Sequence, residues 1–214
     1  MLIKICGLTK VTEADYLNVN HVDFAGFVLF FPKSKRNITI EQAKEIMQAL
    51  DPSIKKTAVV VKPSIKQIRQ IEAAGFDYIQ IHGMIDPALF SQIRLPVLKA
   101  FNVKDIDTIA DYRLDKNVAG YVFDAHEPGS GKSFDWSMLS DIPRDNKLFF
   151  LAGGISADNV KEAIKKLSPD GIDVSTGVEY NASNKTGKDP QKIEEFVRII
   201  RTEQKTYNRF SFYK

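Results

Sequence analysis

The 214-residue sequence has few of the side chains that form disulfides and metal sites. Its single cysteine, Cys6, cannot form an internal disulfide or a cysteine-based metal site. The three histidines, His21, His82 and His126, do not have the spacing of metal ligands. We therefore expect no metal, and a single cysteine is typical of an intracellular protein.

Long apolar runs and an excess of charge of one sign are also lacking. No stretch approaches the roughly 20 apolar residues that cross a bilayer. The N-terminus has no apolar run followed by a small-residue cleavage site, as a secretory signal would. The 30 Lys and Arg residues stand against 27 Asp and Glu, a net charge of only +3. We expect a cytoplasmic protein whose partner is neither a nucleic acid nor a membrane.

Short apolar segments recur along the chain with amphipathic segments between them, which indicates βα units and a parallel sheet. Strands are predicted at residues 2–6, 24–29, 57–61, 78–82, 97–101, 120–124, 148–152 and 172–175. Helices are predicted at residues 13–19, 40–50, 64–74, 86–93, 104–112, 135–140, 157–167 and 190–201. No Gly/Ser-rich linker divides the chain, so we predict one domain over residues 1–204 and a tail over 205–214.

Eight βα units allow a closed barrel or an open doubly wound sheet. In residues 2–6, Ile3 and Ile5 share one strand face while Lys4 and Cys6 share the other. A doubly wound sheet buries both faces under helices, whereas a barrel accepts some polar side chains inside and at its mouth. We therefore predict an α/β fold, a single-domain (βα)8 TIM barrel.

The same alternation predicts which side chains face the barrel interior. Cys6, His82, Phe101, Asp124 and Ser175 are expected on the inward face at the C-terminal ends of their strands, where the active sites of such barrels lie. Deeper inside, we expect a hydrogen-bonded network of four polar residues, with Lys4 or Lys99 facing Asp173. The four are Lys4, Gln80, Lys99 and Asp173.

Two of the rim residues are candidates for acid–base chemistry. Cys6 is either a small buried side chain or a reactive thiol whose pKa neighbouring backbone N–H groups lower. Asp124 either caps a turn or acts chemically at the end of its strand. The loop that follows is not a nucleotide-binding P-loop, because His126 stands where that motif needs glycine. The glycine-rich segment with Lys132 could instead close over a substrate.

The last two predicted strands end in glycine-containing turns, which indicate a phosphate site. Gly153 and Gly154 follow one strand, and Ser175, Thr176 and Gly177 end the other. Backbone N–H groups at these positions of a barrel commonly hold a phosphate. In addition, Arg36 on the loop after the second strand offers a planar fork for a substrate carboxylate.

Around the residues just described, and in further segments, the chain resembles the phosphoribosylanthranilate isomerases of tryptophan biosynthesis. The matching segments are residues 4–9, 26–28, 32–36, 80–83, 99–101, 124, 129–136, 151–155, 173–179 and 187–189. The resemblance implies an Amadori rearrangement of N-(5-phosphoribosyl)anthranilate, an aldose–ketose isomerisation, without a cofactor. It implies a small-molecule substrate and a monomer or homodimer.

The resemblance also implies a role for individual residues. Asp124 would be the general acid and Cys6, as thiolate, the general base. Arg36 would bind the anthranilate carboxylate, and His82 would belong to the substrate site. The phosphate would lie against Gly153, Gly154, Ser175, Thr176 and Gly177.

Two other functions compete with this one. The related aminoaldose isomerase of histidine biosynthesis performs the same rearrangement on a substrate with two phosphates. That family has two aspartates at the positions where this chain has Cys6 and Asp124. A second phosphate turn is not apparent in the first half of this chain. The other alternative is a non-catalytic barrel that binds a sugar phosphate. The aromatic tail over residues 205–214 is expected to be an added packing segment.

Overall fold

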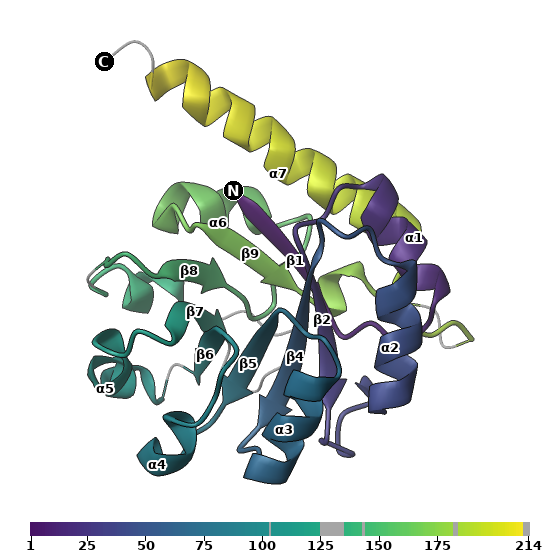
Figure 1. Cartoon of the computed structure of the whole chain (residues 1–214). Coiled ribbons are helices and arrows are strands. Elements are labelled where there is room, and N and C mark those ends of the chain that lie inside the picture. The colour runs from purple at the N-terminus through teal and green to yellow at the C-terminus, as the bar shows by residue number, and fades with distance from the viewer. Residues whose placement is uncertain (103, 125–134, 143, 182–183, 212–214) are drawn as a thin grey trace.

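Eight parallel strands close into a barrel in the computed structural model of the chain (Figure 1). The structure describes residues 1–211 except 103, 125–134, 143 and 182–183. The barrel strands are β1 (Leu2–Cys6), β2 (Phe24–Leu29), β4 (Lys55–Val61), β5 (Tyr78–His82), β6 (Val97–Asn102), β7 (Val118–Asp124), β8 (Leu148–Leu151) and β9 (Gly171–Val174). Pairing of β1 with both β2 and β9 closes the barrel, which confirms the predicted fold. A two-residue strand, β3 (Asn37–Ile38), adds to the edge of β2.

The helices lie outside the strands, as Figure 1 shows. They are α1 (Thr12–Val19), α2 (Ile40–Ala49), α3 (Ile65–Ala73), α4 (Pro87–Phe90), α5 (Ala110–Arg113), α6 (Val160–Leu167) and α7 (Pro190–Ser211), with 3₁₀ turns η1 (Ile106–Ile109), η2 (Trp136–Leu139) and η3 (Thr176–Val178). Thr39 and Ser64 form capping boxes at the starts of α2 and α3. These reciprocal hydrogen bonds explain why the sequence located both starts well.

Helix α4 is much shorter than the predicted segment over residues 86–93. Asp86 caps its start as expected. At its end, the side chains of Ser91 and Gln92 donate hydrogen bonds to the carbonyl of Ala88. Side chains that bond nearby backbone groups compete with the helix, so the chain leaves it after Phe90.

Two apolar clusters confirm the predicted alternation in most strands. A small cluster fills the barrel interior and consists of Phe24, Leu98, Ala100, Val122, Phe150 and Ala152. The larger cluster lies between the strands and the helices and includes Ile3, Ile5, Tyr121 and Phe123. Phe24 meets Phe150 edge-on, with ring centroids 5.5 Å apart. The floor of the barrel is therefore closed by side chains, which leaves the opposite end for a site.

Strand β6 contradicts the prediction, because Phe101 and Lys99 point outward. Leu98 and Ala100 occupy the interior, while the Phe101 ring packs outside beside Tyr112. The Lys99 ammonium lies 4.4 Å from the centroid of Phe101 and donates to the carbonyl of Ala100. Cation–π contacts and a backbone acceptor thus satisfy a lysine that we expected in the barrel centre. Lys99 does not face Asp173.

The other predicted ion pair is present inside the barrel. Lys4 Nζ lies 2.9 Å from Asp173 Oδ2, and both side chains are buried. Burial alone would lower the pKa of Lys4, but the Asp173 carboxylate and Cys6 raise it above its usual value. Lys4 therefore carries its charge directly below the rim.

Helix α7 continues to Ser211, past the boundary expected between residues 204 and 205. It packs against both α1 and α6 (Figure 1). Among the described residues, no helix combines the length and apolarity of a membrane span. The predicted loop with His126 and Lys132 lies outside the described residues.

Candidate active site

A cavity of about 780 Å³ opens at the C-terminal ends of the strands. This volume suits a small organic ligand. All nine residues predicted for the site line it: Cys6, Arg36, His82, Asp124, Gly153, Gly154, Ser175, Thr176 and Gly177. The end of the barrel on which the prediction placed the chemistry is therefore the end that is hollow.

Cys6 ends β1 and is half-buried at the cavity wall. Burial raises the pKa of its thiol, while the charges of Lys4 and Lys188 act to lower it. The net shift is upward, so the pKa is not lowered as it would be if the backbone N–H groups dominated, which was one of the two alternatives for Cys6. At neutral pH the resting group is a thiol with two cations close enough to stabilise its conjugate base.

Asp124 ends β7, three strands along the barrel wall from β1, and also lines the cavity. Its neighbour across the strand pair is Asn102 at the end of β6. Asn102 takes the inward rim position that we had assigned to Phe101 and lines the cavity in its place. The prediction missed Asn102 because it ended the strand one residue early.

His82 lines the cavity as an uncharged ring. Its Nε2 lies 2.9 Å from Gln80 Nε2, one strand step deeper in the barrel. Burial, followed by the charges of Lys99 and Lys4, lowers the pKa of His82 to about 3. His82 therefore stays neutral across the physiological range and serves as a polar wall. Its Nε2 accepts from the Gln80 amide, which leaves Nδ1–H as the donor of the ring.

Arg36 reaches the cavity from the loop between β2 and β3, but it is less free than a surface loop residue. Its Nε donates to Glu179 Oε1 at 2.5 Å, and its Nη2 donates to Thr176 Oγ1 at 2.8 Å. Its side chain is only 10% exposed. The guanidinium is thus oriented by the segment that follows β9.

The two glycine-containing turns meet at the cavity mouth. Gly153 and Gly154 both have positive φ, at 79° and 65°, which glycine adopts without strain. A Cβ on Gly177 would lie 2.2 Å from the carbonyl oxygen of Ile155, so only glycine lets the turns approach this closely. The predicted helix after Gly154 starts later, at Val160, because Asn159 accepts a hydrogen bond from Ser156 N and donates to Gly154 O.

Ser175 and Thr176 use their hydroxyls within the protein. Ser175 Oγ donates to the carbonyl of Cys6 and accepts from Lys188 Nζ. Thr176 Oγ1 accepts from Arg36. An anion in this corner would therefore be held mainly by backbone N–H groups.

Glu179 and Lys188 are the charged residues to which sequence reasoning gave no role. They lie outside the predicted strands, in segments that the family resemblance covers, and the structure buries both beside the cavity. The sequence signal that could have revealed them is that Glu179 and Lys188 are charged residues within short glycine-containing segments. Among the described residues, no three His, Cys, Asp or Glu side chains gather as metal ligands do.

Comparison with known proteins agrees with this architecture. The family model described as N-(5'phosphoribosyl)anthranilate (PRA) isomerase matches residues 3–199. The N-(5'-phosphoribosyl)anthranilate isomerase of Listeria welshimeri is 40% identical over 206 residues, 94% of this chain and 98% of that protein.

Solved structures are similar over the same span. The phosphoribosyl anthranilate isomerase of Thermotoga maritima superposes with a TM-score of 0.82 at 32% identity, covering 94% of this chain and 99% of that one. A second structure, 31% identical with a TM-score of 0.79, is of a phosphoribosyl anthranilate isomerase in complex with reduced 1-(O-carboxyphenylamino)-1-deoxyribulose 5-phosphate, and the match covers 94% of this chain and 100% of that one. The match along nearly the whole chain, on the barrel and rim described above, shows that this chain belongs to the N-(5'-phosphoribosyl)anthranilate isomerase family.

Proposed function

We propose that this protein isomerises N-(5-phosphoribosyl)anthranilate to 1-(2-carboxyphenylamino)-1-deoxyribulose 5-phosphate, a step of tryptophan biosynthesis. The observation that carries the proposal is that Cys6 and Asp124 line one and the same cavity, together with Arg36 and the two glycine-containing turns. An acid, a base, an anion-binding corner and a cationic fork suit a substrate with a sugar phosphate at one end and a benzoate at the other.

Asp124 is the general acid in this proposal. It donates a proton to the ribose ring oxygen as the bond from C1 to that oxygen breaks. The lone pair of the anthranilate nitrogen forms the new C1–N double bond, which opens the ring to a protonated Schiff base. Asp124 leaves this step as a carboxylate.

Cys6 is the general base. Its thiolate removes the proton from C2, and the electrons of that C–H bond move towards the Schiff-base nitrogen to give an enaminol. The enaminol loses its 2-hydroxyl proton and gains one at C1, which yields the 2-keto product. Lys4 and Lys188 support the thiolate electrostatically, because both lower the pKa of Cys6 against the effect of burial.

The two ends of the substrate would be bound by different parts of the rim. We assign the phosphate to Gly153, Gly154, Ser175, Thr176 and Gly177, where two turns meet. Arg36 binds the anthranilate carboxylate as a charged fork. His82 contributes a neutral polar wall between them. No step of this mechanism uses a cofactor.

The same observations weigh against the two alternative functions. The histidine-biosynthesis isomerase has a pair of aspartates as its acid and base, whereas this chain has Cys6 at the end of β1. A non-catalytic sugar-phosphate barrel would have no need of a thiol and a carboxylate lining one cavity. We expect the enzyme to act in the cytoplasm as a monomer or homodimer.

The proposal is tested with purified protein by following the loss of fluorescence of N-(5-phosphoribosyl)anthranilate. Cys6→Ser and Asp124→Asn should each lower kcat at least about 100-fold, the scale of acid–base catalysis. Arg36→Ala should instead raise KM. Glu162→Gln, an exposed charge change on α6, is the matched control and should behave like the parent. Near-normal turnover in either of the first two variants would refute the assigned roles.

A further inference from the structure

A buried group of charges lies directly behind Arg36, and its carboxylate, that of Glu179, has no part in the proposed chemistry. Glu179 follows η3, and Lys188 precedes α7. The Lys188 side chain is fully buried and that of Glu179 is 9% exposed. Burying a carboxylate and an ammonium costs several kcal/mol unless each is well paired, so such a group calls for an explanation.

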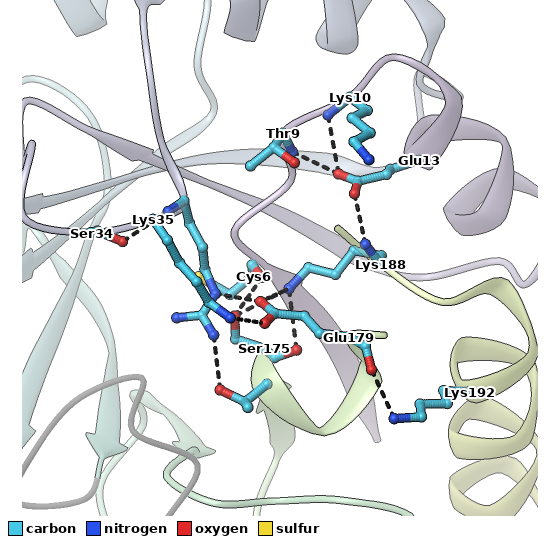
Figure 2. A network of polar contacts seen from close by, with 12 residues as sticks. Cys6, Thr9, Lys10, Glu13, Ser34, Lys35, Ser175, Glu179, Lys188 and Lys192 are labelled. Carbon is cyan, nitrogen blue, oxygen red and sulfur yellow. Dashed lines mark hydrogen bonds and ion pairs between the residues drawn. The ribbon is translucent and has the colours of Figure 1, made fainter. Parts of the chain in front are cut away.

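The Glu179 carboxylate is held on both of its oxygens (Figure 2). Oε1 accepts from Arg36 Nε at 2.5 Å and from Lys188 Nζ at 3.2 Å. Oε2 accepts from Lys35 Nζ at 2.7 Å. Burial would raise the pKa of Glu179, but the Arg36 hydrogen bond, the Lys188 charge and the Lys35 hydrogen bond hold it at about 2. The group is therefore an anion at any pH at which the enzyme works.

Arg36 is fixed by these contacts in a way that leaves part of its fork for a ligand. A guanidinium has five N–H donors. The contacts to Glu179 and Thr176 use one donor on Nε and one on Nη2. Within the described part of the chain, Nη1 makes no hydrogen bond, and Arg36 lines the cavity. The remaining donors are those that could bind a carboxylate in a bidentate manner.

The aliphatic stem of Arg36 is fixed as well. A Cβ added to Gly7 would lie 2.4 Å from Arg36 Cδ, so the stem occupies the space that any larger residue would fill. Gly7 also has a φ of 79°, which favours glycine. Packing against Gly7 on the stem and hydrogen bonds at the head together leave the side chain little freedom to turn.

Lys188 connects this group to the base. Its Nζ donates to the carbonyl and the hydroxyl of Ser175, at 3.2 and 3.1 Å. Ser175 Oγ in turn donates to the carbonyl of Cys6 at 2.9 Å. Figure 2 shows this chain of contacts running from Glu179 through Lys188 and Ser175 to Cys6. The position of the fork is thereby tied to the strand end that carries the thiol.

We propose that Glu179 is a positioning residue for Arg36, which it orients so that the free edge of the guanidinium meets the carboxylate on the aromatic ring of the substrate. Glu179 touches no substrate atom in this arrangement. It determines specificity through Arg36, favouring an aromatic amine with an adjacent carboxylate over one without. The inference rests on the proposed function, because it assumes which end of the substrate Arg36 meets.

The test compares two ligands on the purified full-length protein by calorimetry. One is reduced 1-(2-carboxyphenylamino)-1-deoxyribulose 5-phosphate, and the other is the same compound without the ring carboxylate. Glu179→Gln should weaken binding of the carboxylated compound about 10-fold or more, the scale of a charge-assisted hydrogen bond. Binding of the other compound should change less than about 2-fold, and Glu162→Gln should alter neither.

A double variant separates positioning from a general structural effect. In the Arg36→Ala background, Glu179→Gln should cause no further loss of discrimination between the two ligands, because the residue that it orients is gone. Equal losses for both ligands, or unchanged discrimination in Glu179→Gln, would overturn the inference. If Glu179→Gln does not fold, Glu179→Asp keeps the charge but withdraws it by one methylene and should reduce the discrimination in the same direction.

Failure of this inference is distinguishable from failure of the proposed function. A parent protein that does not turn over N-(5-phosphoribosyl)anthranilate would refute the function itself. A parent that does so, with full discrimination retained in Glu179→Gln, would refute only the role of Glu179.

Discussion

Burial and charge act in opposite directions on the thiol of Cys6. Removing a thiolate from water disfavours it, while the buried ammonium groups of Lys4 and Lys188 favour it. Asp173 adds a further upward effect on the pKa, although its pairing with Lys4 limits that effect. Because burial is the largest influence, the thiolate that the proposed mechanism needs is a minor form of Cys6 at neutral pH.

This balance predicts the titration of Cys6, and the single cysteine makes it directly measurable. Thiolate absorbance near 240 nm, recorded against Cys6→Ser to subtract tyrosine ionisation, should appear only above about pH 9, because the pKa is raised from an ordinary value of 9.0. Lys4→Met should move the transition to still higher pH, since it removes the cation that opposes burial most. A thiolate signal already present at pH 7 would contradict this reasoning.

The contacts of some side chains could be predicted from the sequence, and those of others could not. The pair of Lys4 and Asp173 was predictable, because each occupies an inward position in a strand and an unpaired buried charge is too costly. Glu179 was not, because it lies after a 3₁₀ turn where no periodicity fixes the direction of a side chain. Arg36 was predicted as a free fork, and the partners that hold it come from a segment 140 residues away.

At the scale of elements, the turns after β8 and β9 approach each other closely in the site. Gly177 lies against the carbonyl of Ile155, and backbone cannot rotate aside as a side chain can. The distance between the two turns fixes the spacing of the N–H groups that we assign to the phosphate. A substituent at Gly177 should therefore affect binding as well as stability.

Gly177→Ala tests this coupling. We expect KM for N-(5-phosphoribosyl)anthranilate to rise at least about 10-fold and stability to fall by about 1–3 kcal/mol, the usual cost of overpacking. Gly75→Ala is the matched control, because Gly75 follows α3, has a φ of 88° and has no atom within 4 Å of an added Cβ. It should lose about 1 kcal/mol through backbone strain and leave KM unchanged. Urea unfolding measures the stability of both variants, and steady-state kinetics measure their KM. A normal KM in Gly177→Ala would contradict the assignment of the phosphate to these two turns.

Strand β6 shows why the direction of a strand was harder to predict than its existence. Its existence follows from an apolar run, but Leu98, Lys99, Ala100 and Phe101 give no clear apolar face. The register with β7 shifts between Val97 and Leu98, so the pairing itself is irregular at that point. The outward direction is set by aromatic partners from α5 and β7 that alternation within one strand cannot reveal, Tyr112 among them.

For the whole molecule, the number and order of strands were predictable because each βα unit repeats the same local pattern. Closure was also predictable, since polar residues such as Gln80 and Asp173 stand on strand faces that an open sheet would bury under helices. The lengths of the covering helices were not. Among the described residues between β5 and β8 they are single turns such as α4 and α5. At α4, side-chain hydrogen bonds to the carbonyl of Ala88 outweigh weak helical periodicity.

The last helix joins the two ends of the chain at the barrel end opposite the site. Arg201 on α7 donates to the carbonyls of Met1 and His21 and to Asp23 Oδ2 at 2.9 Å. The same Asp23 oxygen accepts from Ile3 N in β1. One guanidinium thus links α7 to β1 and to the residues that lead into β2, the pair of strands that closes the barrel.

Arg201→Ala should therefore lower the free energy of unfolding without altering catalysis. Because the side chain is 35% exposed, solvent weakens the ion pair, and we expect a loss of about 1–2 kcal/mol, mostly from the hydrogen bonds to the backbone carbonyls of Met1 and His21. Turnover and KM should stay at parent values, since the contacts lie at the closed end of the barrel. Arg198→Ala, an exposed residue on the same helix, should leave stability within about 0.5 kcal/mol of the parent. Equal unfolding midpoints in urea for the two variants would show that packing of α7 alone, and not Arg201, holds the first strand in place.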